Sequence, residues 1–249
     1  MTTNRERVAD DVRAAEQDDV NGVNAFRERV VAAIPDSYKP WLHVLATTSV
    51  GAAAVAFGAW RLTNVGAAEL LTVPIMFVVS NGVEWRAHRN ILHRPLWPLK
   101  DLYQRHTPEH HRVFRHHDMA VRSWKELKLV LIPASGVAAI IAAAVPAAAL
   151  AGAVFGSNVG MLVFITSGAY VATYELSHLV YHLPEESFFG RLPFVKVFRE
   201  HHARHHEPRL MQKWNFNVTV PLWDALMGTI ASDELLQKVQ ARFAKASAA

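Results

Sequence analysis

The histidines of this chain gather in short clusters whose spacing suits metal binding. His201, His202, His205 and His206 lie within six residues, and on a helix His202, His205 and His206 would share one face and converge. A neutral imidazole is the commonest metal ligand in proteins, and a bound cation keeps neighbouring imidazoles neutral and together. Taken alone, the segment has a simpler alternative, a solvated helix that is rich in histidine.

Three further clusters favour metal binding. His106 and His110, like His178 and His182, are four residues apart and would share a helix face, whereas the five-residue step from His88 to His93 needs a helix end or a distortion. One metal ion uses roughly four to six ligands, so about ten clustered histidines predict two ions. The remaining members of these clusters are His111, His116 and His117.

The composition limits the chemistry of such a site. The chain has 249 residues, 14 His and no Cys, which excludes thiolate metal sites, iron–sulfur clusters and cysteine nucleophiles. The first residues are charged and contain no apolar core, so we expect no cleavable signal peptide. The sequence shows no nucleic-acid-binding motif, and its basic clusters flank apolar spans, which favours a membrane over nucleic acid as partner.

Apolar segments separated by charged ones predict four membrane-spanning helices. Residues 41–60 carry no formal charge, residues 67–85 form a weaker span with a buried soluble helix as the alternative, and residues 129–174 are 46 residues without a formal charge. That last length suffices for two crossings with a turn near residues 156–158. An amphipathic helix from Asn24 to Ile34 is expected either to pack on the domain or to lie on the bilayer.

The distribution of charge predicts the orientation of these spans. Residues 86–128 hold ten Lys/Arg and four Asp/Glu, a net charge of +6. The two turns expected on the other side of the membrane, between the first and second spans and between the third and fourth, hold only one charged residue, Arg61. The positive-inside rule therefore puts both termini and every histidine except His43 on the cytoplasmic side. We expect an all-α fold: an integral membrane bundle of four transmembrane helices with a cytoplasmic helical cap that holds a histidine-rich di-metal site.

In their order and spacing, the histidine clusters resemble those of the fatty acid hydroxylase superfamily, membrane di-iron enzymes that include sterol desaturases, fatty-acid 2-hydroxylases and carotenoid hydroxylases. The segment from Asn215 to Thr229 is similar to the tail of that family, which reads Asn-aromatic-Gly, Trp-Asp and Phe-Gly-Thr. The resemblance covers roughly residues 65–230. There are departures: Asn217 stands where Gly is more common, Met227 where Phe is common, and three residues rather than two follow His106 before the histidine pair.

The resemblance implies a set of site residues. The implied metal ligands are His88, His93, His106, His110, His111, His178, His182, His202, His205 and His206. Candidates for additional ligands, or for side chains that contact the ligands, are His116, His117, His201, Glu109 and Asn217. Carboxylates usually orient ligating imidazoles, and Glu84, Asp118, Glu175 and Glu200 are further candidates for that role, with surface ion pairs as the alternative.

The resemblance also implies an activity. The chain would be an O₂-dependent non-haem di-iron oxidoreductase that hydroxylates or desaturates a lipid such as a fatty acyl chain, sterol or carotenoid. Its cofactors would be two Fe²⁺ ions and O₂, with zinc able to replace iron on purification. Because the sequence has no dinucleotide or haem motif, we expect a separate electron donor of ferredoxin or cytochrome type on the basic cytoplasmic face.

The expected location is the bacterial inner membrane, with several crossings. The expected parts are an N-terminal cytoplasmic tail with the amphipathic helix (1–40), a membrane di-iron hydroxylase domain (41–232) and a C-terminal tail (233–249). The alternative function is that of a membrane zinc protein, either a hydrolase or a metal-transport component, that uses the same histidine clusters. A zinc hydrolase needs only about three protein ligands, so most of the clusters would be surplus to it.

Overall fold

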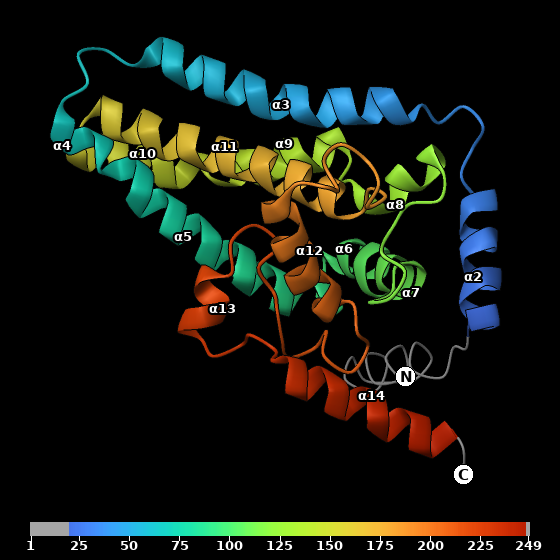
Figure 1. Ribbon diagram of the computed structural model, residues 1–249. Coiled ribbons are helices and arrows are strands. Elements are labelled where there is room, and N and C mark those ends of the chain that lie inside the picture. The colour runs from blue at the N-terminus through green and yellow to red at the C-terminus, as the bar shows by residue number, and fades with distance from the viewer. Residues whose placement is uncertain (1–19, 248–249) are drawn as a thin grey trace. The chain divides into compact units, whose positions relative to one another are not determined.

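The computed structural model describes residues 20–247, so residues 1–19 of the predicted N-terminal tail (1–40) lie outside the described residues. The described residues form helices and no β-strand, which confirms the all-α class. The chain divides into two compact units. Of the described residues, the histidine unit comprises 20–35, Glu84–Arg122 and 181–247, and the membrane unit comprises Asp36–Val83 and Ser123–Val180 (Figure 1).

Among the described residues, four helical segments are long and apolar enough to cross a membrane, as the hydropathy pattern predicts. They are Pro40–Arg61, Ala67–Leu92, Trp124–Phe155 and Ser157–Tyr181. The helices within them are α3 (Pro40–Arg61), α4 (Ala67–Leu70), α5 (Thr72–Ala87), η3 (Trp124–Glu126), α8 (Leu127–Val130), α9 (Ala134–Ala143), α10 (Val145–Phe155) and α11 (Ser157–Tyr181). Large apolar side chains such as Trp60, Leu150 and Phe155 are exposed, which suits a surface that faces lipid.

The predicted turn between the third and fourth spans is confirmed at Gly156. This residue has φ +104°, a conformation that glycine adopts without strain, and it separates α10 from α11. Just beyond it, the side chain of Asn158 donates to the carbonyl of Thr63 at 2.7 Å and to Glu69 at 3.1 Å. The polar groups at this end of the membrane unit therefore satisfy one another.

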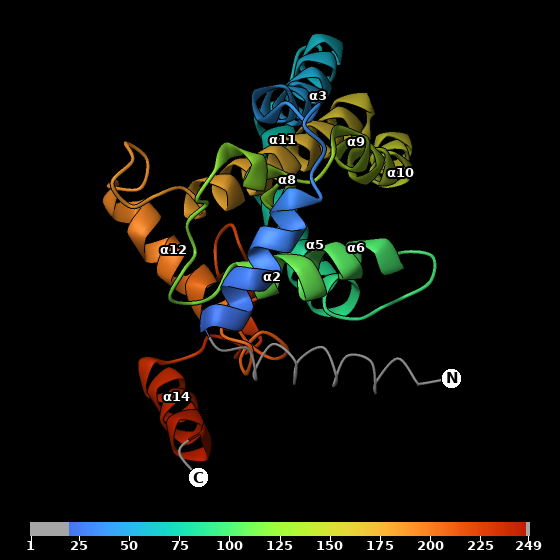
Figure 2. The ribbon, with the colours of Figure 1, turned by 90° about the vertical axis from the view of Figure 1, so that its right-hand side faces the viewer.

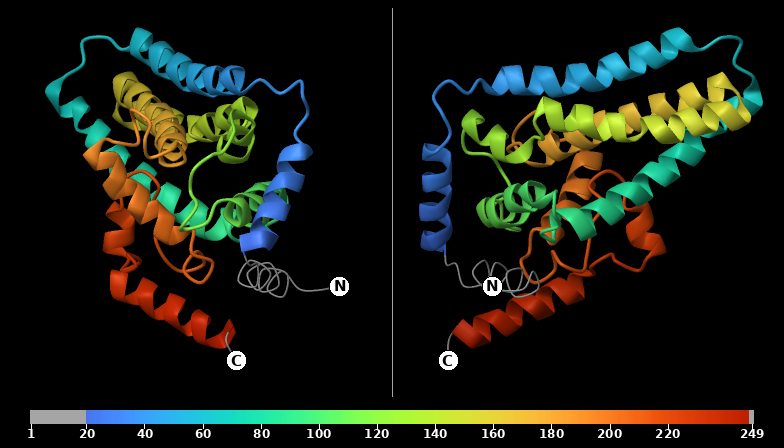
Figure 3. Two further views of the ribbon diagram at one scale, coloured as in Figure 1. Left: turned by 45° about the vertical axis from the view of Figure 1, so that its right-hand side comes forward. Right: turned by 180° about the vertical axis from the view of Figure 1, so that it is seen from behind.

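Small residues allow the helices of the membrane unit to approach closely. In Figures 1 and 3, α3, α9, α10 and α11 run side by side. A Cβ added at Gly160 of α11 would lie 2.8 Å from Cα of Gly152 on α10, and a Cβ added at Gly51 of α3 would lie 2.7 Å from Cβ of Ala172. Close contact at glycine is the usual way in which helices associate in a membrane.

The histidine unit contains the remaining helices. They are α2 (Val20–Ala32), η1 (His88–Leu92), α6 (Lys100–Gln104), η2 (Arg105–His110), α7 (His111–Val113), α12 (Pro193–His205), α13 (Leu222–Leu226) and α14 (Asp233–Ser247). Leu236 of α14 packs on Leu210 and Ala231. The amphipathic helix is α2; it lies beside α7 with Val23 and Arg27 buried, so it packs on protein (Figure 2).

Candidate metal centre

Two π-helices, η1 and η2, contain His88, His106 and His110, and His93 and His111 directly follow them. The π-helix repeats hydrogen bonds between residues five apart rather than four. In η1 it supplies the distortion that the step from His88 to His93 requires, and the two rings stack with centroids 5.1 Å apart. In η2 it takes up the extra residue around Pro108, so that His106 and His111, also five apart, approach to 4.7 Å between ring centroids.

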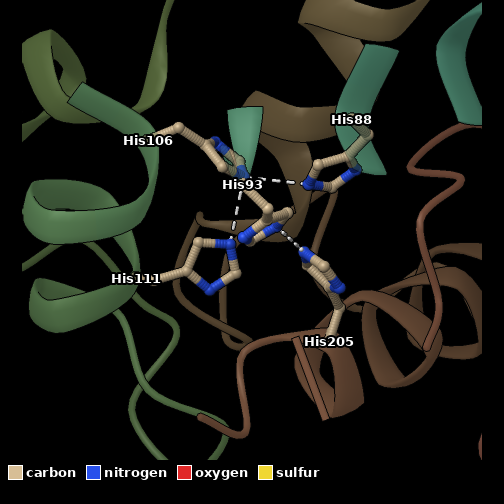
Figure 4. A group of neighbouring side chains, drawn as sticks. All are labelled: His88, His93, His106, His111 and His205. Atoms are coloured by element: carbon tan, nitrogen blue, oxygen red, sulfur yellow. Dashed lines mark hydrogen bonds between the residues drawn. The ribbon is translucent and has the colours of Figure 1, made fainter. Parts of the chain in front are cut away.

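The histidines form two buried groups. In each group, one ring nitrogen from every residue lies within 4.8 Å of the others. Figure 4 shows how the rings of the first group, which come from three separate stretches of the chain, point toward one another. The first group is His88, His93, His106, His111 and His205, and the second is His110, His178, His182, His202 and His206. His178 lies in the last turn of α11, and His182 directly follows the end of that helix.

All ten histidines of the implied ligand set fall in these groups, but two clusters divide in a way that the spacing did not predict. His106 belongs to the first group and His110 to the second, although four residues separate them. His205, the last residue of α12, belongs to the first group, and His206, which follows it, belongs to the second. Adjacent residues of an α-helix point about 100° apart, so one helix end can serve both groups.

The two groups adjoin. The rings of His111 and His206, one from each group, stack with centroids 4.2 Å apart and planes 22° apart. The rings of His106 and His110 stack in the same way across the division, with centroids 5.4 Å apart. Two ions held by these groups would therefore be close neighbours in one buried site.

Backbone carbonyls fix the protonation of four rings. A carbonyl oxygen only accepts hydrogen bonds, so the Nδ1 that faces it carries the hydrogen, and Nε2 keeps its lone pair. These Nδ1 atoms lie 2.5–2.8 Å from their carbonyl oxygens. The pairs are His88 with Phe216, His182 with Met119, His205 with Trp214 and His206 with Phe114.

His93 is fixed through a hydroxyl. Thr107 donates its single hydroxyl hydrogen to the carbonyl of Leu92 at 2.8 Å and accepts from Nδ1 of His93 at 2.9 Å. The Nε2 atoms of His93 and His205 then both lack a hydrogen, and they lie only 2.9 Å apart. Two facing lone pairs repel unless a cation shares them, so this donor set fits a metal ion.

Burial keeps these rings neutral. It is the largest cause that lowers the pKa of His93, His106, His111, His205 and His206 well below the usual value. Burial lowers the pKa of His182 to about 3, against the hydrogen bond to Met119, and the charges of Arg199 and Arg27 lower it further. At neutral pH these imidazoles are therefore unprotonated, the form that binds metals.

The other candidate histidines lie outside both groups. His201 contacts Asp224, with Nε2 3.1 Å from Oδ2. His116 and His117 are in neither group, nor is Glu109 of η2. His43, in the membrane unit, hydrogen-bonds with the hydroxyl of Tyr38 and the carbonyl of Ile132.

A buried carboxylate organises the segment that holds His88. Asp224 is completely buried and accepts from the N–H groups of Phe216 and Asn217 at 3.0 and 2.7 Å, and from the hydroxyl of Thr229 at 2.6 Å. The amide oxygen of Asn217 in turn accepts from the N–H of Asp224 at 3.1 Å. Asn217 thus shapes the backbone whose Phe216 carbonyl orients His88.

Sequence reasoning expected carboxylates beside the imidazoles and missed the groups that fix these five rings. Glu84, one of those carboxylates, accepts from the backbone N–H of Val218 and the hydroxyl of Thr219. The four carbonyls carry no sequence signal, because every residue has one. Thr107 had one weak signal, its place between His106 and His110 in the sequence.

Comparison with known proteins identifies one family. A sequence model described as fatty acid hydroxylase matches residues 73–229. The matched segment contains both histidine groups and the loop around Asp224. No curated protein and no solved structure matches the chain.

Proposed function

The chain belongs to the fatty acid hydroxylase family, and from that premise we propose that it is an O₂-dependent di-iron enzyme that hydroxylates or desaturates a membrane lipid. The observation that carries the di-iron assignment is the pair of adjoining groups, each with five buried imidazoles. Five nitrogen ligands per ion lie within the usual four to six, and a nitrogen-rich set suits iron.

The proposed ligands are the ten grouped histidines. The first ion would be held by His88, His93, His106, His111 and His205, and the second by His110, His178, His182, His202 and His206. The orientation of five Nε2 lone pairs by Nδ1 hydrogen bonds supports this assignment. His116, His117, His201 and Glu109 are not proposed as ligands.

Two iron ions, when bound, would supply the electrons that reduce O₂ and the oxidising power needed to break an unactivated C–H bond. The protein's own contribution is to hold and shield them. Neutral imidazoles leave the centre cationic, and their burial keeps water away from it. The carbonyls of Phe114, Met119, Trp214 and Phe216 hold four rings in the metal-binding tautomer.

The lipid substrate would reach the site from within the bilayer, and electrons would reach it from the cytoplasm. Four apolar helices favour a multi-pass protein, and the proposed location is a bacterial inner membrane with both termini cytoplasmic. A lipid already dissolved in the bilayer is the natural substrate class. Residues 86–128, with a net charge of +6, would attract an acidic ferredoxin or cytochrome as electron donor.

Metal analysis separates this proposal from the zinc alternative. Protein expressed in iron-supplemented medium and purified anaerobically should contain two iron ions per chain and consume O₂ when a reductant is supplied. Zinc that cannot be replaced by iron, with no reductant-dependent O₂ uptake, would support a zinc protein instead.

Lipid analysis tests the reaction. Cells that express the wild-type chain should accumulate a lipid heavier by one oxygen atom, or lighter by two hydrogen atoms, than its precursor. Cells that express the double variant His205→Ala, His206→Ala, which removes one proposed ligand from each group, should not. Identical lipid profiles across all classes would defeat the proposal.

A further inference from the structure

A buried arginine on the N-terminal helix contacts the segment beside the second histidine group. Only 2% of the Arg27 side chain is exposed. One Nη donates to Oδ2 of Asp118 at 3.0 Å, the other donates to the carbonyl of Ala120 at 2.7 Å, and the guanidinium lies 5.2 Å from the ring centre of Phe114. A buried cation is costly unless it is paired, and here a carboxylate, a carbonyl and an aromatic ring all compensate it.

The segment that Arg27 contacts supplies two of the orienting carbonyls. Phe114 and Met119 lie in residues 114–121, and their carbonyls accept from Nδ1 of His206 and His182 at 2.6 and 2.7 Å. The segment is a tight turn, closed by reciprocal backbone hydrogen bonds between Arg115 and Asp118. Arg27 contacts it on both sides of Met119 and at Phe114, so it restrains the position of both carbonyls.

The first group is held by a different segment. The carbonyls that orient His205 and His88 belong to Trp214 and Phe216. Asp224 holds that segment through the backbone N–H groups of residues 216 and 217. A change at Arg27 should therefore reach the second group and leave the first largely intact.

We propose that Arg27 is a positioning residue for the second histidine group: from α2, which precedes the residues matched by the family, it locks the 114–121 turn so that Phe114 and Met119 hold His206 and His182 in the metal-binding orientation. The inference rests on the proposed di-metal site. It gives the N-terminal helix a part in metal binding, although α2 supplies no ligand.

Metal binding by Arg27→Ala tests the inference, with Co²⁺ as a probe whose absorption bands report nitrogen ligation. Metal-free protein in detergent is titrated with Co²⁺. The wild type should bind two ions, and Arg27→Ala should bind one of them about 10–100-fold more weakly, the range usual when the groups that orient a metal ligand are disturbed. The matched control is Arg29→Ala, which removes the same charge from an exposed position on the same helix.

Two further backgrounds identify the weakened site. In His205→Ala protein, where the first group is damaged, Arg27→Ala should weaken the remaining ion by the same 10–100-fold. In His206→Ala protein, where the second group is damaged, it should change the remaining affinity less than threefold. The effect of Arg27→Ala should thus depend on an intact second group, which is the non-additivity expected of residues that act on the same site. A general loss of stability would weaken both sites.

Several outcomes would overturn the inference. Folded Arg27→Ala protein with two wild-type Co²⁺ affinities would do so, as would equal weakening of both sites. If Arg27→Ala does not fold, Arg27→Lys decides, because lysine keeps the charge but lacks the planar, multidentate guanidinium; an intermediate loss confined to the second site is expected, and wild-type affinity would refute the role. Wild-type protein that binds fewer than two ions would instead overturn the di-metal proposal and the inference with it.

Discussion

The hydroxyl of Thr107 joins the two π-helices: its oxygen lies 2.9 Å from Nδ1 of His93, at the end of η1, and its hydrogen points to the carbonyl of Leu92 at 2.8 Å. Thr107 itself belongs to η2 and is 3% exposed. One oxygen thus fixes both the orientation and the tautomer of a grouped histidine.

Replacement of Thr107 should therefore weaken metal binding without removing a ligand. Thr107→Val keeps the shape of the side chain but leaves Nδ1 of His93 without its acceptor, and we expect metal affinity at the first group to fall about 10–100-fold. Thr107→Ser keeps the hydroxyl and should bind metal like the wild type. Co²⁺ titration of the two variants measures the difference, and equal affinities would contradict the role of the hydroxyl.

The neighbours His201 and His202 should behave differently. His201 contacts Asp224 outside both groups, whereas His202 lies in the second group with its Nε2 3.1 Å from that of His206. His201→Ala should retain two metal ions per chain, and His202→Ala should lose about one. Elemental analysis of the purified variants gives the counts, and metal loss in His201→Ala alone would reverse the assignment.

Acid should destabilise the metal-free protein. Above the usual histidine pKa of 6.5, the buried imidazoles with lowered pKa values, such as those of His93 and His182, are neutral in the folded and the unfolded chain alike. Below pH 6.5 the unfolded chain takes up protons that the buried rings do not, since their pKa values are lowered and that of His182 is about 3. The free energy of unfolding should hence be flat above about pH 7 and fall as the pH drops from 6.5 toward 3, each such ring contributing up to about 1.4 kcal/mol per pH unit.

Denaturant titrations across this pH range measure the fall. The variant His182→Gln has one titrating ring fewer, so its stability should decline with a shallower slope. Stability that rises on acidification would show that the rings are not neutral in the folded protein.

Removal of metal should lower the melting temperature. Without a cation, the facing Nε2 lone pairs of His93 and His205, 2.9 Å apart, repel each other. A bound ion adds about 4 kcal/mol when it is present at a thousand times its dissociation constant. Thermal unfolding with and without a chelator at pH 7.5 should show this loss, and His205→Ala protein should respond less; an unchanged melting temperature would argue against a bound ion.

Close packing in the membrane unit can be tested at Gly160. A Cβ there would lie 2.7 Å from the carbonyl oxygen of Ala148, so Gly160→Val should force α10 and α11 apart and lower the melting temperature in detergent. Gly66→Ala is the control, because the nearest atom to an added Cβ is 3.7 Å away. A Gly160→Val protein as stable as this control would show that the helices can adjust.

The amino-acid sequence by itself determined the features that follow from local periodicity. The lengths of the apolar segments predicted the four spans, and the glycine at position 156 predicted the turn between the last two. The five-residue step between His88 and His93 predicted a helix end or a distortion, and the distortion is η1. These features depend on residues a few positions apart, and the physical constraints on them, helix pitch and membrane thickness, are the same in every protein.

Only the tertiary structure decided which rings face one another and what holds them. The division of His106 from His110 and of His205 from His206 depends on contacts with distant helices, and the carbonyl of Phe114 reaches His206 across 92 positions of the chain. Any residue could supply such a carbonyl, so no side-chain pattern marks it. The burial of Arg27 in the 114–121 turn is likewise invisible in a helix that reads as amphipathic, because its partners come from a segment some 90 residues away.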